Sequence, residues 1–127
     1  MKKSTEQLHK SKVDFVLERI SEDIYKEYAV EELADMVSMS KFHFHRIFKG
    51  LVGEPVKEYI RNLRLERAAK DLASTDKKIK EIQKECMYGS AEAFSRAFKY
   101  HYGVSPTEYR NKFGWNNVAV NSLDSRE

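Results

Sequence analysis

Apolar residues recur along this 127-residue chain at intervals of three and four positions, and nowhere alternate for long with polar residues. That spacing places them on one side of an α-helix, so the pattern predicts an all-α fold. The expected helices are about 6–25, 30–37, 41–51 and 55–72, a fifth that contains Ile79, Ile82 and Cys86, then 91–102 and about 106–113. The fourth of these seven helices, roughly 27 Å long, is long enough to join two halves of the chain.

Polar residues stand at most of the expected helix starts. Ser40 and Ser90 are expected to cap the third and sixth helices, and Asp76 the fifth. Ser105 and Glu108, with a proline between them, predict a capping box at the start of the seventh helix. A tyrosine and an alanine precede the second helix, so its start has no expected side-chain cap.

A block of about twenty residues occurs twice, fifty positions apart, at 40–59 and 90–109. The identical positions are Ser40/Ser90, Phe44/Phe94, Arg46/Arg96, Phe48/Phe98, Lys49/Lys99, Gly53/Gly103, Glu58/Glu108 and Tyr59/Tyr109. They include apolar residues at helical spacing and a basic pair on another side of the same turns. Both a buried face and a charged face are therefore repeated, as in a chain that grips one extended, acidic partner at two places.

Two stripes divide each repeated helix. In the third helix Phe44, Ile47, Phe48 and Leu51 are expected to face the core, and Phe42, His45, Arg46 and Lys49 to face outward. In the sixth helix the expected inward residues are Phe94, Ala97 and Phe98, and the outward residues are Glu92, Ser95, Arg96 and Lys99. A short helix, a tight turn and a second helix with a basic outward face is the outline of a helix-turn-helix, whose second helix enters the major groove of DNA.

The helix-turn-helix outline predicts the division of the chain. Residues 1–54 form the expected first helix-turn-helix subdomain and 73–113 the second, with 55–72 as the linker helix. Residues 114–127 have no clear period and are expected to be a flexible tail or linker.

The outward residues suit base edges of duplex DNA. Arg46 and Arg96 can each donate two hydrogen bonds to guanine or clamp a phosphate, and the alternative for both is a structural salt bridge. Phe42 can pack on a thymine methyl, unless it is buried under a neighbouring helix. His45 can reach a base edge. Glu92 can accept from cytosine, or it only favours the dipole at the helix start.

The second repeated helix has fewer side chains that can contact bases, because Ala91 and Ala93 flank Glu92. The first helix is therefore expected to discriminate more between sequences. Residues expected to contact phosphates are Ser40, Lys41, Lys49, Ser90, Ser95 and Lys99.

Composition narrows the function classes. The net charge of +3 is only mildly basic, but Lys and Arg concentrate on and between the repeats, while acids crowd the first third. No stretch is long and apolar enough for a membrane span, and the basic start leads into no signal-peptide core. One cysteine, Cys86, allows no internal disulfide and is expected to be a core residue, so a cytoplasmic protein is expected.

Two other classes of function each find some support in the sequence. The four histidines and Cys86 suggest metal or nucleophile chemistry, but none of them pairs at ligand spacing, so neither an enzyme nor a cofactor is expected. A helical protein-interaction module centred on an exposed Phe42 is the remaining alternative. The salt dependence of binding distinguishes the two functions: DNA binding through several phosphates weakens steeply as salt rises, whereas an apolar protein contact does not.

The segment 94–110, FSRAFKYHYGVSPTEYR, carries a family resemblance that 31–40, 45–49 and 61–72 support. Over 8–113 the chain resembles the DNA-binding domain of the AraC/XylS family of bacterial transcription regulators. The resemblance implies a seven-helix, two-lobed domain that binds an asymmetric duplex site of ~20 bp, usually activating transcription by contact with RNA polymerase. The base-reading positions it implies are Phe42, His45, Arg46, Ala91, Glu92, Ala93 and Arg96.

The chain departs from that family at two places. Met87 and Tyr88 stand where the family commonly has glycine and phenylalanine, so the sixth helix is expected to enter at a different angle. Glu92 replaces a longer polar residue. Family members often carry an effector domain, and here it would follow Glu127, with 114–127 as its linker; the alternative is a complete single-domain activator.

Overall fold

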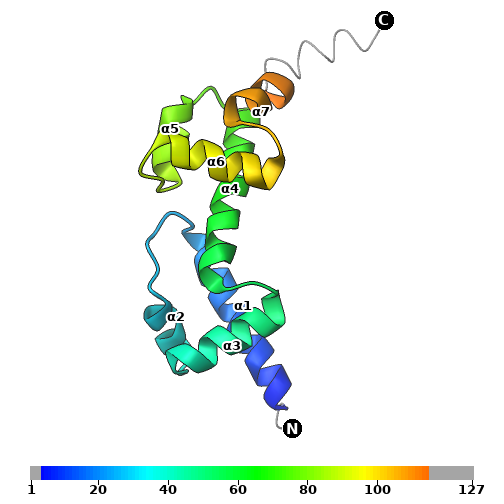
Figure 1. The fold of residues 1–127 in the computed structure, drawn as a ribbon. Helices are drawn as coiled ribbons and strands as arrows, with labels where there is room; N and C mark the ends of the chain where they lie inside the picture. Colours follow the sequence, from blue (N-terminus) through cyan, green and yellow to red (C-terminus); the bar gives the residue numbers. More distant parts are fainter. Residues whose placement is uncertain (1–3, 115–127) are drawn as a thin grey trace, which may run out of the picture. The chain divides into compact units, whose positions relative to one another are not determined.

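The computed structural model describes residues 4–114, and these form seven α-helices without a strand (Figure 1). The all-α fold predicted from the apolar periodicity is confirmed. The helices are α1 (Thr5–Glu22), α2 (Val30–Met36), α3 (Lys41–Val52), α4 (Val56–Ser74), α5 (Ile79–Glu85), α6 (Ala91–Tyr102) and α7 (Pro106–Phe113). The tail expected after Gly114 lies outside the described residues. No described helix is long and apolar enough to cross a membrane.

Most of the predicted helix caps are present. The Ser40 hydroxyl accepts a hydrogen bond from the backbone N–H of His43. Ala29, the N-cap residue of α2, makes no side-chain cap bond, as expected. Ser105 and Glu108 form the predicted capping box of α7, with proline in its first turn. A second capping box, which the periodicity did not indicate, joins Ser4 to Gln7 at the start of α1.

The prediction that Asp76 caps α5 is wrong. Lys78 holds the N-cap position and makes no side-chain cap bond. Two other residues hold this turn. The Thr75 hydroxyl accepts a hydrogen bond from the Lys77 N–H at 3.3 Å, and the Arg110 guanidinium donates one to the Lys77 carbonyl. The helix therefore begins only after Lys78, whose backbone is extended.

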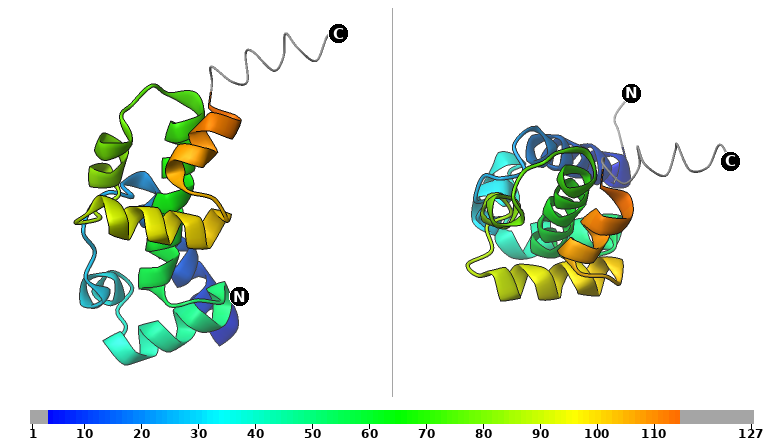
Figure 2. Two further views of the ribbon diagram at one scale, coloured as in Figure 1. Left: turned by 45° about the horizontal axis from the view of Figure 1, so that its top comes forward. Right: turned by 90° about the horizontal axis from the view of Figure 1, so that it is seen from above.

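The chain divides within α4 into two compact units, 1–61 and 62–127. In the first unit α1 and α2 both pack on α3, and in the second α6 contacts both α5 and α7, as the two views of Figure 2 also show. The first core is centred on Val16, Ile20, Leu33, Phe44 and Phe48. The second is centred on Leu65, Leu72, Ile82, Phe94 and Phe98.

The two units repeat their burial pattern almost position by position. Each residue of 41–59 has the same class of exposure as its counterpart in 91–109, except that His45 is exposed and Ser95 is half-buried. The rings repeat as well. Phe48 lies edge-on to Tyr59 with centroids 5.8 Å apart, and their counterparts Phe98 and Tyr109 lie edge-on at 5.4 Å. The sequence repeat is therefore a repeat of packing.

One expected core residue is exposed. Leu51 was assigned to the inward stripe of α3, but 51% of its surface is open to solvent. It lies in the last turn of α3, where the helix extends past the buried Phe44 and Phe48. Val52 is the half-buried residue of that turn instead, and Gly53, with φ at +98°, then ends the helix.

Candidate nucleic-acid interface

The turn that joins the two helices of each helix-turn-helix repeats two of its backbone hydrogen bonds. In the first unit the Met39 N–H donates to the Ala34 carbonyl, and in the second the Tyr88 N–H donates to the Gln83 carbonyl, at 3.0 and 3.3 Å. The matching pairs are 49 positions apart, whereas the helices that follow are 50 apart. The extra residue predicted in the second turn therefore falls after Tyr88, before α6 begins.

Both turns use a left-handed residue that is not glycine. Ser38 has φ at +56°, and its counterpart Met87 has φ at +65°. This conformation brings the Cβ close to the following carbonyl and costs about 1–2 kcal/mol in a residue other than glycine. In the second turn the ring of Tyr88, the residue after Met87, contacts Phe94 of α6 with centroids 5.7 Å apart.

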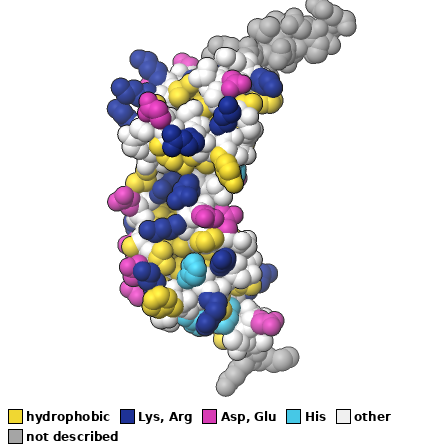
Figure 3. All heavy atoms as spheres, viewed as in Figure 1, with side chains coloured by type: hydrophobic (Ala, Val, Ile, Leu, Met, Phe, Trp, Pro, Cys, Tyr) yellow, Lys and Arg dark blue, Asp and Glu magenta, His cyan; other side chains and the backbone are white. Residues whose placement is uncertain are grey.

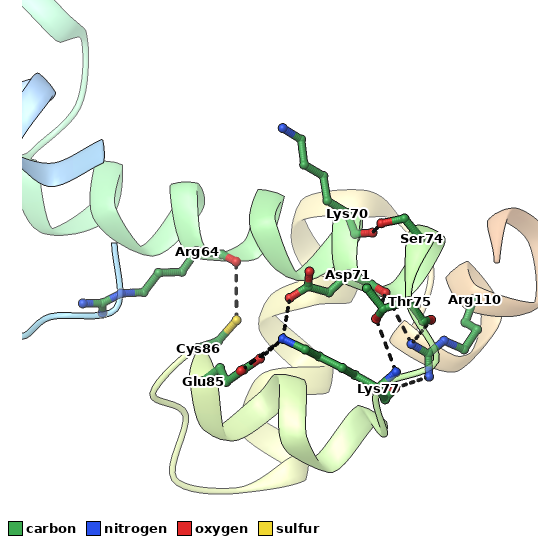
Figure 4. Close-up of polar contacts among 9 residues, drawn as sticks. All are labelled: Arg64, Lys70, Asp71, Ser74, Thr75, Lys77, Glu85, Cys86 and Arg110. Atoms are coloured by element: carbon green, nitrogen blue, oxygen red, sulfur yellow. Dashed lines mark hydrogen bonds and ion pairs between the residues drawn. The ribbon is translucent and has the colours of Figure 1, made fainter. Parts of the chain in front are cut away.

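The second unit holds its helix-turn-helix through Arg110 of α7, a role that the sequence did not indicate (Figure 4). Its guanidinium donates to four backbone carbonyls at the end of α4 and in the loop that follows. The acceptors are the carbonyls of Asp71, Leu72, Thr75 and Lys77, at 2.5 to 3.5 Å. Arg110 thus ties α7 to the C-terminal end of α4 and to the segment that leads into α5.

Lys77 continues the same network. Its ammonium contacts the carboxylates of Glu85, at 3.2 Å, and Asp71, at 3.9 Å. The pKa of Lys77 is raised, first by the hydrogen bond with Glu85 and then by the charge of Asp71. The ion pair joins α4 to the end of α5, so the first helix of the second helix-turn-helix is held at both of its ends.

Cys86 is buried beside this network, as expected of a core residue. Only 2% of it is exposed, and its Sγ–H donates to the Arg64 carbonyl at 3.4 Å. Burial, and then the charges of Asp71 and Glu85, raise the pKa of the thiol to about 12. A neutral, inaccessible thiol is a packing group, not a nucleophile.

The outward stripe of α3 is open to solvent. Phe42 is 83% exposed, which contradicts the alternative that a neighbouring helix buries it. His45, Arg46 and Lys49 are exposed beside it. Lys41, an expected phosphate contact, is exposed at the start of the same helix. In Figure 3 the Lys and Arg side chains of this unit stand among His and apolar side chains.

The outward stripe of α6 is likewise exposed at Glu92, Arg96 and Lys99, whereas Ser95 is half-buried. Within residues 4–114 neither Arg46 nor Arg96 takes part in a hydrogen bond or ion pair. The salt-bridge alternative for these two arginines is therefore wrong for the part of the chain that is described. Both guanidiniums are available to a partner.

The small residues predicted for the site have mixed surroundings. Ser40 and Ser90 are N-caps, and the Ser90 hydroxyl accepts from the Ala93 N–H at 3.1 Å, so part of their bonding capacity is used. Ala91 is exposed, but Ala93 is half-buried on the same side of α6 that His43 occupies on α3. Ala93 is accordingly the least accessible of the predicted base contacts.

Tyr100 is an exposed aromatic that the sequence comparison overlooked. It is 94% open to solvent in the last turn of α6, four residues after Arg96 and eight after Glu92. This spacing places it on the outward side of the helix. Its counterpart in the first unit is Gly50, so Tyr100 is not among the residues that the two repeats share. The signal in the sequence that indicates its position is its i+4 spacing from Arg96.

Two helix-turn-helix units, each with an exposed basic second helix, define a class of nucleic-acid-binding proteins. Residues 33–112 match the family described as a helix-turn-helix domain. The chain belongs to the AraC/XylS family of helix-turn-helix DNA-binding transcription regulators.

Named relatives of the chain differ in length. It is 42% identical over 91 residues to the HTH-type transcriptional regulator YbfP of Bacillus subtilis, of which the match spans 31%. It is 30% identical to the HTH-type transcriptional activator AarP of Providencia stuartii, over 90% of this chain and 85% of that protein. The chain thus spans about a third of one relative and most of the other.

Solved structures share the fold. An AraC-type transcriptional regulator from Chromobacterium violaceum superposes with a TM-score of 0.77 at 26% identity, covering 84% of this chain and 95% of that one. The DNA-binding domain of the global transcriptional factor AdpA, solved in complex with a target DNA, gives a TM-score of 0.73 at 27% identity. That match covers 80% of this chain and 91% of the AdpA domain.

Proposed function

We propose that this chain regulates transcription by binding duplex DNA sequence-specifically, with α3 and α6 lying in successive major grooves of an asymmetric site. The observation that carries the proposal is a repeated pair of exposed cations on the two second helices, Arg46 with Lys49 and Arg96 with Lys99. None of the four side chains takes part in a hydrogen bond or ion pair within residues 4–114. A major groove accepts an α-helix, and successive grooves on one side of the duplex lie ~34 Å apart. The site is accordingly about two helical turns long.

The residues divide between bases and backbone. Arg46 and Arg96 reach guanine edges with two hydrogen bonds each, and Phe42 and His45 read neighbouring bases in the first groove. Glu92, with Ala91 and Ala93 around it, reads little in the second groove. The phosphate contacts come from Lys41, Lys49 and Lys99 and from the serines Ser40, Ser90 and Ser95.

The proposed division of labour follows the chain. Residues 1–54 and 73–113 each supply one groove contact, and the helix over 55–72 joins them. We assign activation as the regulatory outcome, with RNA polymerase as protein partner, because a relative that spans most of the same length is named an activator.

The test replaces one arginine of each unit. Arg46→Ala and Arg96→Ala each weaken binding to a duplex selected from a random pool by ~1–3 kcal/mol and leave the helical content unchanged. Arg19→Ala is the matched control, because Arg19 is an exposed arginine of α1 that pairs with Glu22 at 3.1 Å. Equal binding by the parent and both groove variants contradicts the assignment of α3 and α6.

A second candidate function rests on Phe42. An aromatic side chain that is 83% exposed also suits the centre of an apolar contact with another protein. Salt separates the two functions, because each phosphate contact releases counterions and an apolar contact releases none. If the affinity of the chain for its partner changes little as salt rises from about 50 to about 200 mM, the protein-interaction module is favoured.

A further inference from the structure

The last turn of α6 carries a feature that the proposed base and phosphate contacts leave unexplained. Tyr100 is 94% exposed, more than any other large hydrophobic residue of the described chain, and its ring has no aromatic neighbour there. Single exposed apolar residues are common, but this one continues the outward stripe formed by Glu92 and Arg96 at i, i+4 and i+8.

The position of Tyr100 along α6 selects its partner. At 1.5 Å per residue it lies about 12 Å along the helix axis from Glu92. The major groove is about 12 Å wide, and the first turns of a recognition helix lie over the base edges. The last turn of α6 therefore reaches the sugar-phosphate strand that borders the groove, and Lys99 stands beside Tyr100 in that turn.

We propose that Tyr100 is a DNA-backbone contact of the second unit, its phenol O–H donating to a phosphate oxygen and its ring packing on the adjoining deoxyribose. This inference rests on the proposed function and extends it. Tyrosine is one of the side chains that make such phosphate bonds. Because it has few rotatable bonds, little conformational entropy is lost when it is immobilised on the DNA. The charge that draws the strand to this face comes from Arg96 and Lys99. Neither side chain forms a hydrogen bond or ion pair within residues 4–114, although the charge of Lys99 also acts on Glu108.

The first unit has no such group. Gly50 occupies the equivalent position of α3, and a Cβ there would meet no atom within 4 Å apart from its chain neighbours and the nearby backbone of the same helix. The first unit instead has its exposed aromatic, Phe42, in the first turn, over the bases. Each recognition helix thus carries one large exposed ring, at opposite ends: one placed to read sequence and the other placed to grip the backbone.

The experiment measures binding of the full chain to a selected duplex and to a random-sequence duplex, each across a salt series. Tyr100→Ala weakens binding to both duplexes by the same factor, about 5- to 10-fold, and Tyr100→Phe by about threefold through loss of the O–H donor alone. Neither variant changes the salt slope, because tyrosine is neutral. Lys99→Ala weakens binding and lowers the slope by about 1.

His101→Ala is the matched control, since His101 is exposed in the same turn but lies on another side of the helix. Circular dichroism and thermal unfolding establish that Tyr100→Ala folds. Undiminished binding by Tyr100→Ala, while Arg96→Ala still binds weakly, overturns the backbone role of Tyr100 and leaves the proposed function standing. A loss confined to the selected duplex overturns it too, in favour of a base contact. A parent chain that binds neither duplex removes both proposals together.

Discussion

The two helix-turn-helix units share their buried side and one exposed Arg–Lys pair, and differ in the rest of their exposed side. Three buried or half-buried rings, Phe44, Phe48 and Tyr59, recur as Phe94, Phe98 and Tyr109 with similar ring contacts. At exposed positions of the repeat, Glu92 replaces Phe42 and Tyr100 replaces Gly50. A close-packed core tolerates little change in volume, and an exposed face tolerates almost any. The same fold can therefore be presented twice to two different stretches of one partner.

The largest expected effect tests whether the two cores are equivalent. Phe48→Ala and Phe98→Ala each remove a fully buried ring and are expected to lower the free energy of unfolding by about 3–5 kcal/mol. Phe42→Ala, an exposed phenylalanine in the same helix as Phe48, is the control and changes stability by less than about 0.5 kcal/mol. Denaturant unfolding measures all three.

Unequal costs would break the equivalence of the two cores. If Phe98→Ala costs less than half as much as Phe48→Ala, the additional rings of the second unit compensate. Tyr102 is the candidate for this compensation, with its ring centroid 4.7 Å from that of Phe98. Where an alanine variant fails to fold, the Leu variants at the same positions give the same comparison at a smaller cost.

The second prediction concerns a place where the units are held differently. Ile60 is buried in the first unit, and its counterpart Arg110 bonds four carbonyls in the second. Arg110→Met keeps the apolar stem but removes the donor to the carbonyls of Leu72, Thr75 and Lys77, and is expected to cost about 2–3 kcal/mol. The Asp71 carbonyl keeps its hydrogen bonds from the Thr75 N–H and hydroxyl. Hydrogen exchange of the amides in α5 is expected to rise, because the loop into α5 loses its tie.

Arg110→Lys separates geometry from charge. A single ammonium cannot reach four carbonyls in different directions, so this variant is expected to lose most of the same stability. Full stability in Arg110→Lys would show that the positive charge alone, acting on the end of α4, accounts for the effect.

How far the fold followed from the sequence depends on how local each cause is. Helix periodicity and the caps at Ser40, Ser90 and Ser105 act over three to five residues, and these predictions were confirmed. The bonds of Arg110 join residues 33 to 39 positions apart, so no local pattern contained them. The same tertiary contact explains why Asp76 does not cap α5.

The candidate site was predictable to a similar depth. The outward stripe at i, i+3, i+4 and i+7 located Phe42 and Arg46 on the exposed face of α3, because that face is a property of one helix. Tyr100 was missed because the repeat drew attention to shared residues, and its counterpart is a glycine. Leu51 was misplaced because periodicity gives the direction of a side chain but not where the neighbouring core ends.

The third prediction sharpens the functional contrast between α3 and α6. Phe42→Ala is expected to reduce the free-energy difference between specific and non-specific DNA binding by about 1 kcal/mol, because an apolar contact with a thymine methyl is lost. Glu92→Ala is expected to change base preference little. Sequencing the duplexes bound by each variant measures both, and a large loss confined to sites with one particular cytosine in the Glu92 variant would reverse the ranking.

The smallest expected effect concerns the capping box of α7, which has no equivalent at the start of α4, where Pro55 is the counterpart of Ser105. Hydrogen bonds from the Ser105 side chain and then its backbone N–H lower the pKa of Glu108 below its ordinary value of 4.5. The stabilisation from this carboxylate is therefore fully present above pH 4.5 and is lost as pH falls from there through the lowered pKa. Glu108→Gln is expected to flatten that acid limb of thermal stability and to leave stability at pH 7 nearly unchanged, because glutamine can also close the box. Glu58→Gln is the matched control: Pro55, the counterpart of Ser105, has neither a hydroxyl nor an N–H to offer its carboxylate, so the acid limb is expected to stay as in the parent.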